Sequence, residues 1–99
     1  MMQVQIIENQ ADVVGTIRAV SAHQTLANFY TLKFDVEDVA PVGSLPNLLA
    51  SAKGMSIEIT ASAEELARRK LAAGQKVTLR VKKSGPAVVF LIPEKTDTR

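Results

Sequence analysis

The chain has 99 residues, enough for one domain with a single modest core. Its composition, 46% hydrophobic and 22% charged, is that of a globular protein and not of a disordered one. It contains no cysteine, which excludes disulfides and thiolate metal sites. No apolar run approaches the ~18 residues that a membrane span needs, and the first residues lack the pattern of a secretory signal. We therefore expect a soluble, cytoplasmic protein with no membrane partner.

The net charge of +2 hides an asymmetry between the two halves of the chain. Residues 1–50 carry two basic and five acidic side chains, whereas residues 51–99 carry ten basic and five acidic ones. Such a basic half can form a surface for anions or nucleic acid. It can equally attract the acidic half across one domain, so that most of the charge is compensated.

The first extended regions are predicted over residues 3–9 and 12–20. In "DVVGTIRAV", period-two alternation places Val13, Ile17 and Ala19 on one face together with Gly15, and Arg18 and the remaining residues on the other. A glycine inside a strand pattern usually marks a bulge or a sharp bend, which lets one strand serve both sides of a barrel.

The next strand is predicted in "NFYTLKFDVED", residues 28–38, after a polar connection over residues 21–28. The run contains three of the four aromatic residues of the chain. Alternation assigns the two faces of this strand as follows: Tyr30, Leu32, Phe34 and Val36 point to the core, while Phe29, Thr31, Lys33 and Asp35 point outward.

A short helix is predicted over residues 43–54, with Ser44 as its cap, Pro46 in the first turn and Gly54 at its end. The strand "MSIEIT", residues 55–60, should follow. Its alternation predicts that Met55, Ile57 and Ile59 are buried.

The strongest helix signal is "SAEELARRKLAAG", residues 62–74, where Ser62 and Glu65 form a capping box and Gly74 ends the helix. Basic residues 68–70 suit the negative end of its dipole. A terminal hairpin follows: the strand 75–83 points Val77, Leu79 and Val81 inward, residues 84–86 turn, and "AVVFLIP" returns.

This order of elements resembles the OB-fold, an all-β, five-stranded Greek-key barrel with its helix between strands 3 and 4. The resemblance is carried by Gly15 in "VVGTIRAV", by the helix after "MSIEIT" and by the hairpin "KVTLRVKKSGPAVVFLIP". It implies one barrel domain over residues 1–93, with one or two short helices and a disordered tail at 94–99. The C-terminal part is also somewhat similar to small oxyanion-binding domains of molybdate transporters, although the long connection at 40–53 departs from them.

An OB-like barrel implies a binding module, with single-stranded DNA or RNA as the leading ligand. In that fold, aromatic rings around strands 2 and 3 stack bases and basic side chains follow the phosphates. The candidate residues are Arg18, Phe29, Thr31, Lys33, Arg80, Lys82 and Lys83.

Each of these candidates also has a structural interpretation. Phe29 can pack under a loop or at a subunit contact, and Lys33 can pair with an acidic neighbour. Lysine on an edge strand also protects a sheet from aggregation. Acidic side chains near the same face, such as Asp35 and Glu58, would repel phosphates.

The alternative function is assembly with protein, either another copy or a different chain. Leu45, Leu48 and Leu49 lie on the 40–53 connection and would offer an apolar surface if that connection does not fold back onto the barrel. If it does fold back, these leucines plug one end of the barrel.

Enzymatic motifs do not occur in the sequence. His23 is the only histidine and lies in a polar connection, where we expect it to be solvated. No catalytic triad, paired carboxylates, metal-ligand spacing or glycine-rich phosphate loop is recognisable. We therefore expect no catalytic residues, no metal and no cofactor.

Overall fold

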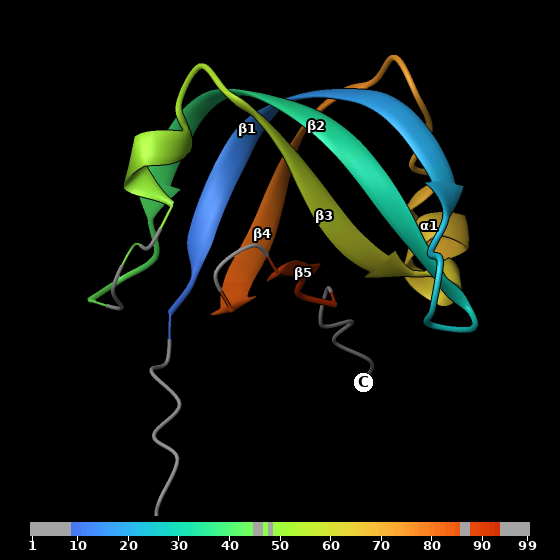
Figure 1. Ribbon diagram of the computed structural model, residues 1–99. Coiled ribbons are helices and arrows are strands. Elements are labelled where there is room, and N and C mark those ends of the chain that lie inside the picture. The colour runs from blue at the N-terminus through green and yellow to red at the C-terminus, as the bar shows by residue number, and fades with distance from the viewer. Residues whose placement is uncertain (1–8, 45–46, 48, 86–87, 94–99) are drawn as a thin grey trace, which may run out of the picture.

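The computed structural model describes residues 9–44, 47, 49–85 and 88–93. The predicted extended region 3–9 is thus described only at Asn9, and the predicted tail at 94–99 lies outside the described residues. Figure 1 shows the elements in chain order: β1 (Ala11–Ala22), β2 (Phe29–Pro41), the 3₁₀ turn η1 (Ala50–Ala52), β3 (Ser56–Ser62), α1 (Ala63–Arg69), β4 (Lys76–Gly85) and β5 (Val88–Leu91).

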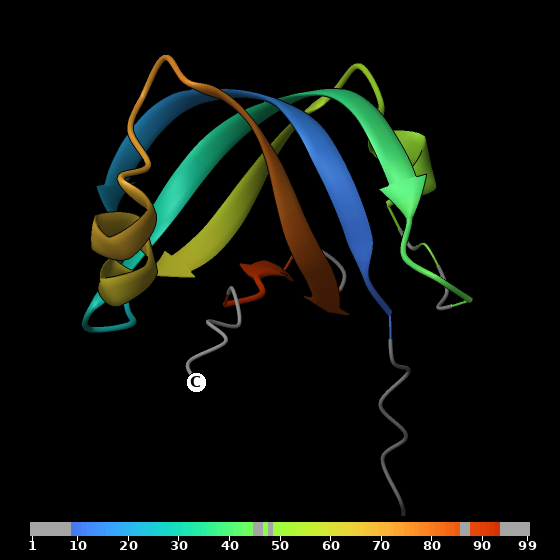
Figure 2. The ribbon, with the colours of Figure 1, turned by 180° about the vertical axis from the view of Figure 1, so that it is seen from behind.

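The five strands form a closed barrel in the order β1-β2-β3-β5-β4, with β4 pairing back onto β1. Neighbouring strands are antiparallel except β3 and β5, which are parallel. Helix α1 joins β3 to β4 and lies at one end of the barrel, while η1 lies at the other end (Figures 1 and 2). The predicted fold class is confirmed as a mainly β-stranded, five-stranded closed barrel with its helix between strands 3 and 4.

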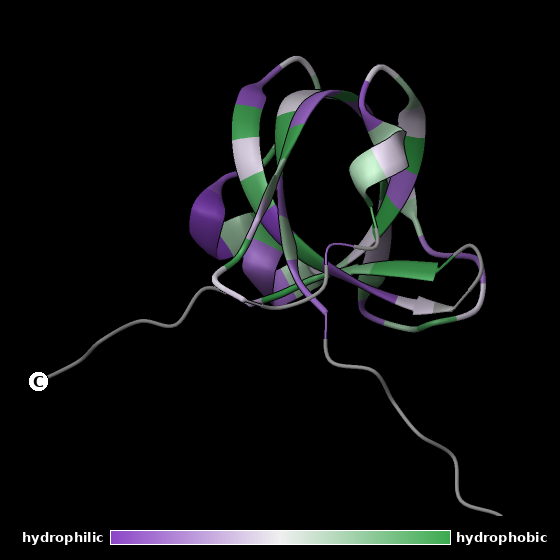
Figure 3. Ribbon diagram, turned by 90° about the vertical axis from the view of Figure 1, so that its left-hand side faces the viewer, coloured by the Kyte–Doolittle hydropathy of each residue, from purple (hydrophilic) through white to green (hydrophobic). Residues whose placement is uncertain are grey.

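The core is built from the inward face of every strand, and hydrophobic and polar residues alternate along the ribbons (Figure 3). The predicted inward faces of β2 and β4 are confirmed at Leu32, Phe34 and Leu79, all fully buried. Burying a large apolar side chain contributes about 1.5–3 kcal/mol, so these positions dominate the stability of the barrel. The largest fully buried side chains are Phe34, Ile17, Leu32, Ile59, Leu79, Val13 and Val81.

Strand β1 bends at Gly15. The β1–β2 register shifts between Val14 and Gly15, as the sequence predicted for a glycine inside a strand. A Cβ atom on residue 15 would overlap the carbonyl oxygen of Asp35 and would lie 3.0 Å from Cε2 of Phe34. The two strands therefore approach each other more closely than any side chain at residue 15 allows, and β1 bends to pair with both β2 and β4.

A second register shift lies between Ile17 and Ala19, and it changes which face the following residues occupy. Arg18 is the extra residue of this bulge. Ala19 is consequently exposed, and Val20 packs against the core instead. The predicted inward position of Ala19 is wrong, because strict alternation does not survive an inserted residue.

The connection between β2 and β3 contains less helix than predicted for residues 43–54. Ser44 lies in an exposed turn and does not cap a helix; η1 begins after Leu49 and has no side-chain cap. Met55 is predicted to be buried, but it is 57% exposed, so that prediction is wrong. Its N–H donates to the Ala52 carbonyl (2.9 Å) and its carbonyl accepts from Val36 N–H (2.8 Å), so residue 55 belongs to the turn that leads into β3.

Helix α1 starts as predicted and ends earlier. The Ser62 hydroxyl accepts a hydrogen bond from Glu65 N–H at 3.1 Å, which confirms the predicted cap. Lys70, not Gly74, takes the left-handed conformation that ends the helix. The N–H of Leu71 then donates to the carbonyl of Leu66 (3.0 Å), and Leu71 packs against the core, which continuing the helix would prevent.

Replacing Gly15 by alanine should destabilise the barrel by about 2–3 kcal/mol, because β1 and β2 must separate to admit the new methyl group. Gly43→Ala is the matched control: residue 43 has a φ of 53° and no atom near its Cβ position, so only backbone strain of about 1 kcal/mol is expected there. Denaturant unfolding of both variants measures the difference. Equal destabilisation would contradict the close approach at Gly15.

Candidate functional site

The connection between β1 and β2 is shaped by His23. Its Nδ1 accepts hydrogen bonds from the backbone N–H groups of Thr25 and Leu26, both at 3.1 Å. Because Nδ1 is an acceptor, the proton of the neutral imidazole lies on Nε2. At the end of the loop Asn28 takes a left-handed conformation, with a φ of 66°, and its carbonyl accepts from Ala63 N–H at 2.9 Å. His23 is half-buried and organises the loop, a role that the sequence did not indicate.

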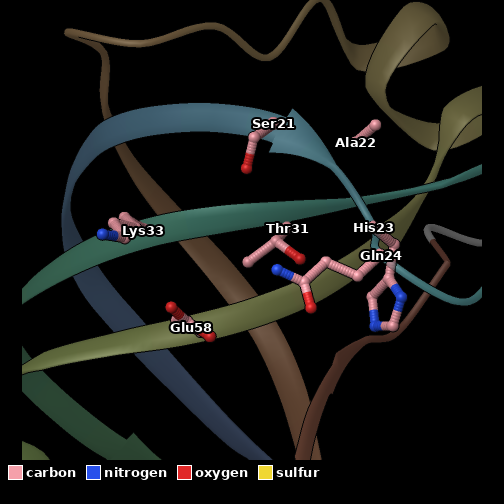
Figure 4. Close-up of a pocket in the computed structure, with 7 residues that line it drawn as sticks. All are labelled: Ser21, Ala22, His23, Gln24, Thr31, Lys33 and Glu58. Carbon is pink, nitrogen blue, oxygen red and sulfur yellow. The ribbon is translucent and has the colours of Figure 1, made fainter.

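A polar groove of about 380 Å³ lies where this loop meets the outer face of the barrel. Strands β1, β2 and β3 each contribute side chains to it, and the side chain of Gln24 extends over the strands beside Thr31 (Figure 4). Ala22 is the only apolar residue of the lining, so the groove offers donors and acceptors and little hydrophobic surface. Its lining comprises Ser21, Ala22, His23, Gln24, Thr31, Lys33 and Glu58.

Residues that pair across neighbouring strands continue the outward-facing surface from the groove around the barrel. Thr31 pairs with Ser21 on one side and with Thr60 on the other. Thr60 pairs in turn with Phe90, and Phe90 pairs with Lys82. Since directly paired residues point to the same side of a sheet, these five side chains form one row on the outer side of the barrel, in which Thr60 is only 9% exposed.

Two aromatic rings flank the strand β3 on this outer side. Phe29 belongs to β2 and is half-buried. Phe90 belongs to β5 and is also half-buried, between the inward-pointing Val89 and Leu91. Phe90 is not recognisable in the sequence as an outward residue, because the run "AVVFLIP" is apolar throughout and shows no alternation. With β3 between them, the strands that carry the two rings lie about 10 Å apart.

Two of the predicted basic residues are engaged in ion pairs. Arg18 Nη1 lies 3.0 Å from Asp35 Oδ2, and the guanidinium of Arg80 contacts both carboxylate oxygens of Asp12, at 2.8 and 3.1 Å. The hydrogen bonds that Arg80 donates to Asp12, and then the negative charge of Asp12, raise the pKa of Arg80 above its ordinary value. Both arginines already have anionic partners, so a phosphate would have to compete for them.

Further ion pairs join the acidic and basic halves of the chain. Lys76 Nζ lies 3.1 Å from Glu37 Oε1, and Lys53 Nζ lies 3.8 Å from Asp38 Oδ1. With the Asp12–Arg80 pair, they show that opposite halves of the chain compensate each other across the barrel. These ion pairs offset part of the difference in charge between the two halves of the sequence.

The predicted lysines differ in their surroundings. Lys33 and Lys82 are exposed, and among the described residues neither forms an ion pair, even though Lys33 pairs in register with Glu58. Lys83 pairs with the buried Val89 and is half-buried, so it points to the opposite side of the sheet from Lys82. Lys33 and Lys82 are thus the two predicted cations that the outer face presents.

The basic end of α1 has a structural role. Arg68 lies 2.6 Å and Arg69 3.8 Å from the carboxylate of Glu65, which is only 4% exposed. The two arginines therefore compensate a buried charge on their own helix.

Of the three leucines predicted to bind a partner, the structure describes only Leu49. Leu49 is 6% exposed and belongs to the core, together with Ala52 of η1. Leu45 and Leu48 lie outside the described residues. At Leu49, then, the connection folds back onto the barrel and plugs its end.

Other kinds of site find no support in the described part of the chain. No group of three or more His, Asp or Glu side chains is placed there to hold a metal ion. The helices described there are also too short and too polar to cross a membrane. The chain matches no protein-family model, no curated protein and no solved structure in the three comparisons made.

His23→Phe should loosen the loop, because the ring is kept while the acceptor for Thr25 and Leu26 is lost. Amide hydrogen exchange of these two residues should accelerate about fivefold, as expected for the loss of a hydrogen bond of about 1 kcal/mol. His23→Asn is the control, since an Asn side chain accepts from the N–H two residues ahead. Equal protection in both variants would show that His23 does not organise the loop.

Proposed function

We propose that this protein is a non-enzymatic binding module of the OB-fold superfamily and that it binds single-stranded nucleic acid on the outer face of β2, β3 and β5. The observation that carries the proposal is the placement of Phe29 and Phe90 on the two sides of β3, next to a polar groove. Strand order supports the superfamily, because β1-β2-β3-β5-β4 with a parallel β3–β5 pair is the arrangement of an OB barrel.

Two rings on one sheet surface suit unpaired bases better than a duplex. Bases of single strands stack on exposed aromatic side chains, and each stacked base contributes about 1–3 kcal/mol. Phe29 and Phe90 are half-buried, so part of each residue stays accessible to a base. Thr31 is half-buried, lines the groove and offers a hydroxyl group to the sugar or the base.

The charge on this face favours moderate affinity. Lys33 and Lys82 provide two positive charges for phosphates, one on each side of β3. Arg18 and Arg80 contribute less, because Asp35 and Asp12 neutralise them. The small number of available cations predicts a shallow dependence of affinity on salt, with a slope of about −0.7 for each phosphate neutralised on a single strand.

The assembly alternative has less support. Leu49, one of its three leucines, is part of the core and is not offered to a partner. The small-oxyanion alternative would need converging cations, whereas among the described residues that line the groove Lys33 is the only Lys or Arg, and Glu58 lies beside it.

Removing either ring should weaken binding of a labelled single-stranded oligonucleotide. Phe90→Leu keeps an apolar side chain but loses the aromatic face, so we expect a five- to tenfold rise in Kd, and a similar rise for Phe29→Leu. Met55→Leu is the control, because Met55 is an exposed apolar residue at the far end of β3. Fluorescence anisotropy measures all three variants.

Two results would contradict the proposal. One is the absence of binding to both DNA and RNA strands at low salt. The other is binding that neither phenylalanine substitution weakens, which would place the nucleic acid on another surface.

A further inference from the structure

Within the proposed nucleic-acid site, and resting on that proposed function, we infer that the groove recognises guanine through Lys33 and Glu58. Glu58 is a carboxylate that non-specific binding does not explain. Glu58 is exposed on the face where phosphates would pass, and it would repel them. An acidic side chain in such a place is useful to a ligand that presents N–H donors.

Lys33 and Glu58 are direct neighbours on adjacent strands. They pair in register across β2 and β3, and both line the groove (Figure 4). Opposite charges at such positions usually attract each other. Here, within the described residues, neither side chain forms an ion pair. A donor group and an acceptor group therefore stand side by side at the groove, and both are available to a ligand.

The Watson–Crick edge of guanine has the complementary pattern. It presents the acceptor O6 next to two N–H donors, at N1 and at the 2-amino group. A carboxylate accepts two parallel N–H bonds, as it does in bidentate pairs. Glu58 can take both donors while the ammonium of Lys33 donates to O6. Single-stranded nucleic acid exposes this edge, because the base has no pairing partner.

The other bases fit this pair less well. Adenine and cytosine present an amino donor where guanine has O6, and that amino group would face the ammonium of Lys33. Uracil and thymine present the acceptor O4 to Lys33 and one donor, N3–H, to Glu58, so the second oxygen of Glu58 stays without a partner. The expected order of affinity is guanine first, then uracil or thymine, and adenine and cytosine last.

The test uses labelled oligothymidine strands that carry one central guanine, hypoxanthine, cytosine or adenine. Anisotropy titration at fixed salt should give about tenfold tighter binding for guanine than for adenine, the size expected for one bidentate base contact. Hypoxanthine lacks the 2-amino group and should lie between them. Glu58→Gln replaces one acceptor by a donor and should remove the preference for guanine while binding of the strand persists.

Asp38→Asn is the matched control. It removes the same charge from an exposed position near the other end of β2, and it should leave the preference for guanine unchanged. Strand binding without any preference for guanine, or a preference that Glu58→Gln does not reduce, would overturn the guanine assignment and leave the proposed function standing. Binding to none of the strands would overturn both.

Discussion

The barrel depends on the absence of a side chain at residue 15. There β1 passes so close to β2 that a Cβ atom would overlap the Asp35 carbonyl. The close contact occurs where β1 bends. The first part of β1, Ala11–Thr16, pairs with β4 on its other edge. The same approach brings the Phe34 ring under the strand, where it is the largest fully buried side chain. The close contact between β1 and β2 at Gly15 therefore lies next to Phe34, the largest side chain of the core.

The outer surface follows from that closure together with the distribution of charge along the chain. The ion pairs Asp12–Arg80 and Glu37–Lys76 each join β4 to a strand of the first half. Exposed pairs of this kind contribute at most about 1 kcal/mol to stability. Their larger effect is on the surface, because they cancel charge around β1 and leave Lys33 and Lys82 as the basic residues of the outer face. Part of the positive charge of the second half of the sequence is thus neutralised by acidic residues of the first half.

The sequence predicts regular alternation and the irregularity marked by Gly15, but it does not predict the other departures from alternation. Strand β2 alternates over residues 31–36 and strand β4 over residues 77–82, so the sequence predicts the faces of these segments residue by residue. Ala19 was assigned to the wrong face because the bulge at Arg18 depends on how β1 meets β2. Met55 was misplaced because its backbone closes a turn with Ala52 and Val36, and hydrophobicity alone does not reveal such bonds. In both cases the outcome was decided by contacts between segments and not by local pattern.

The candidate site shows the same division between local and long-range information. The run over residues 28–38 concentrates three aromatic residues, yet Phe34 builds the core and Tyr30 lies on the same inward side of the strand. The second ring of the outer face comes from Phe90, more than fifty residues away, through the pairing of Thr60 with Phe90. That parallel β3–β5 contact is also the one that closes the barrel between the middle of the chain and its last strand. Any loosening of the closure would separate Phe29 from Phe90, so the geometry of the outer face is coupled to the stability of the fold.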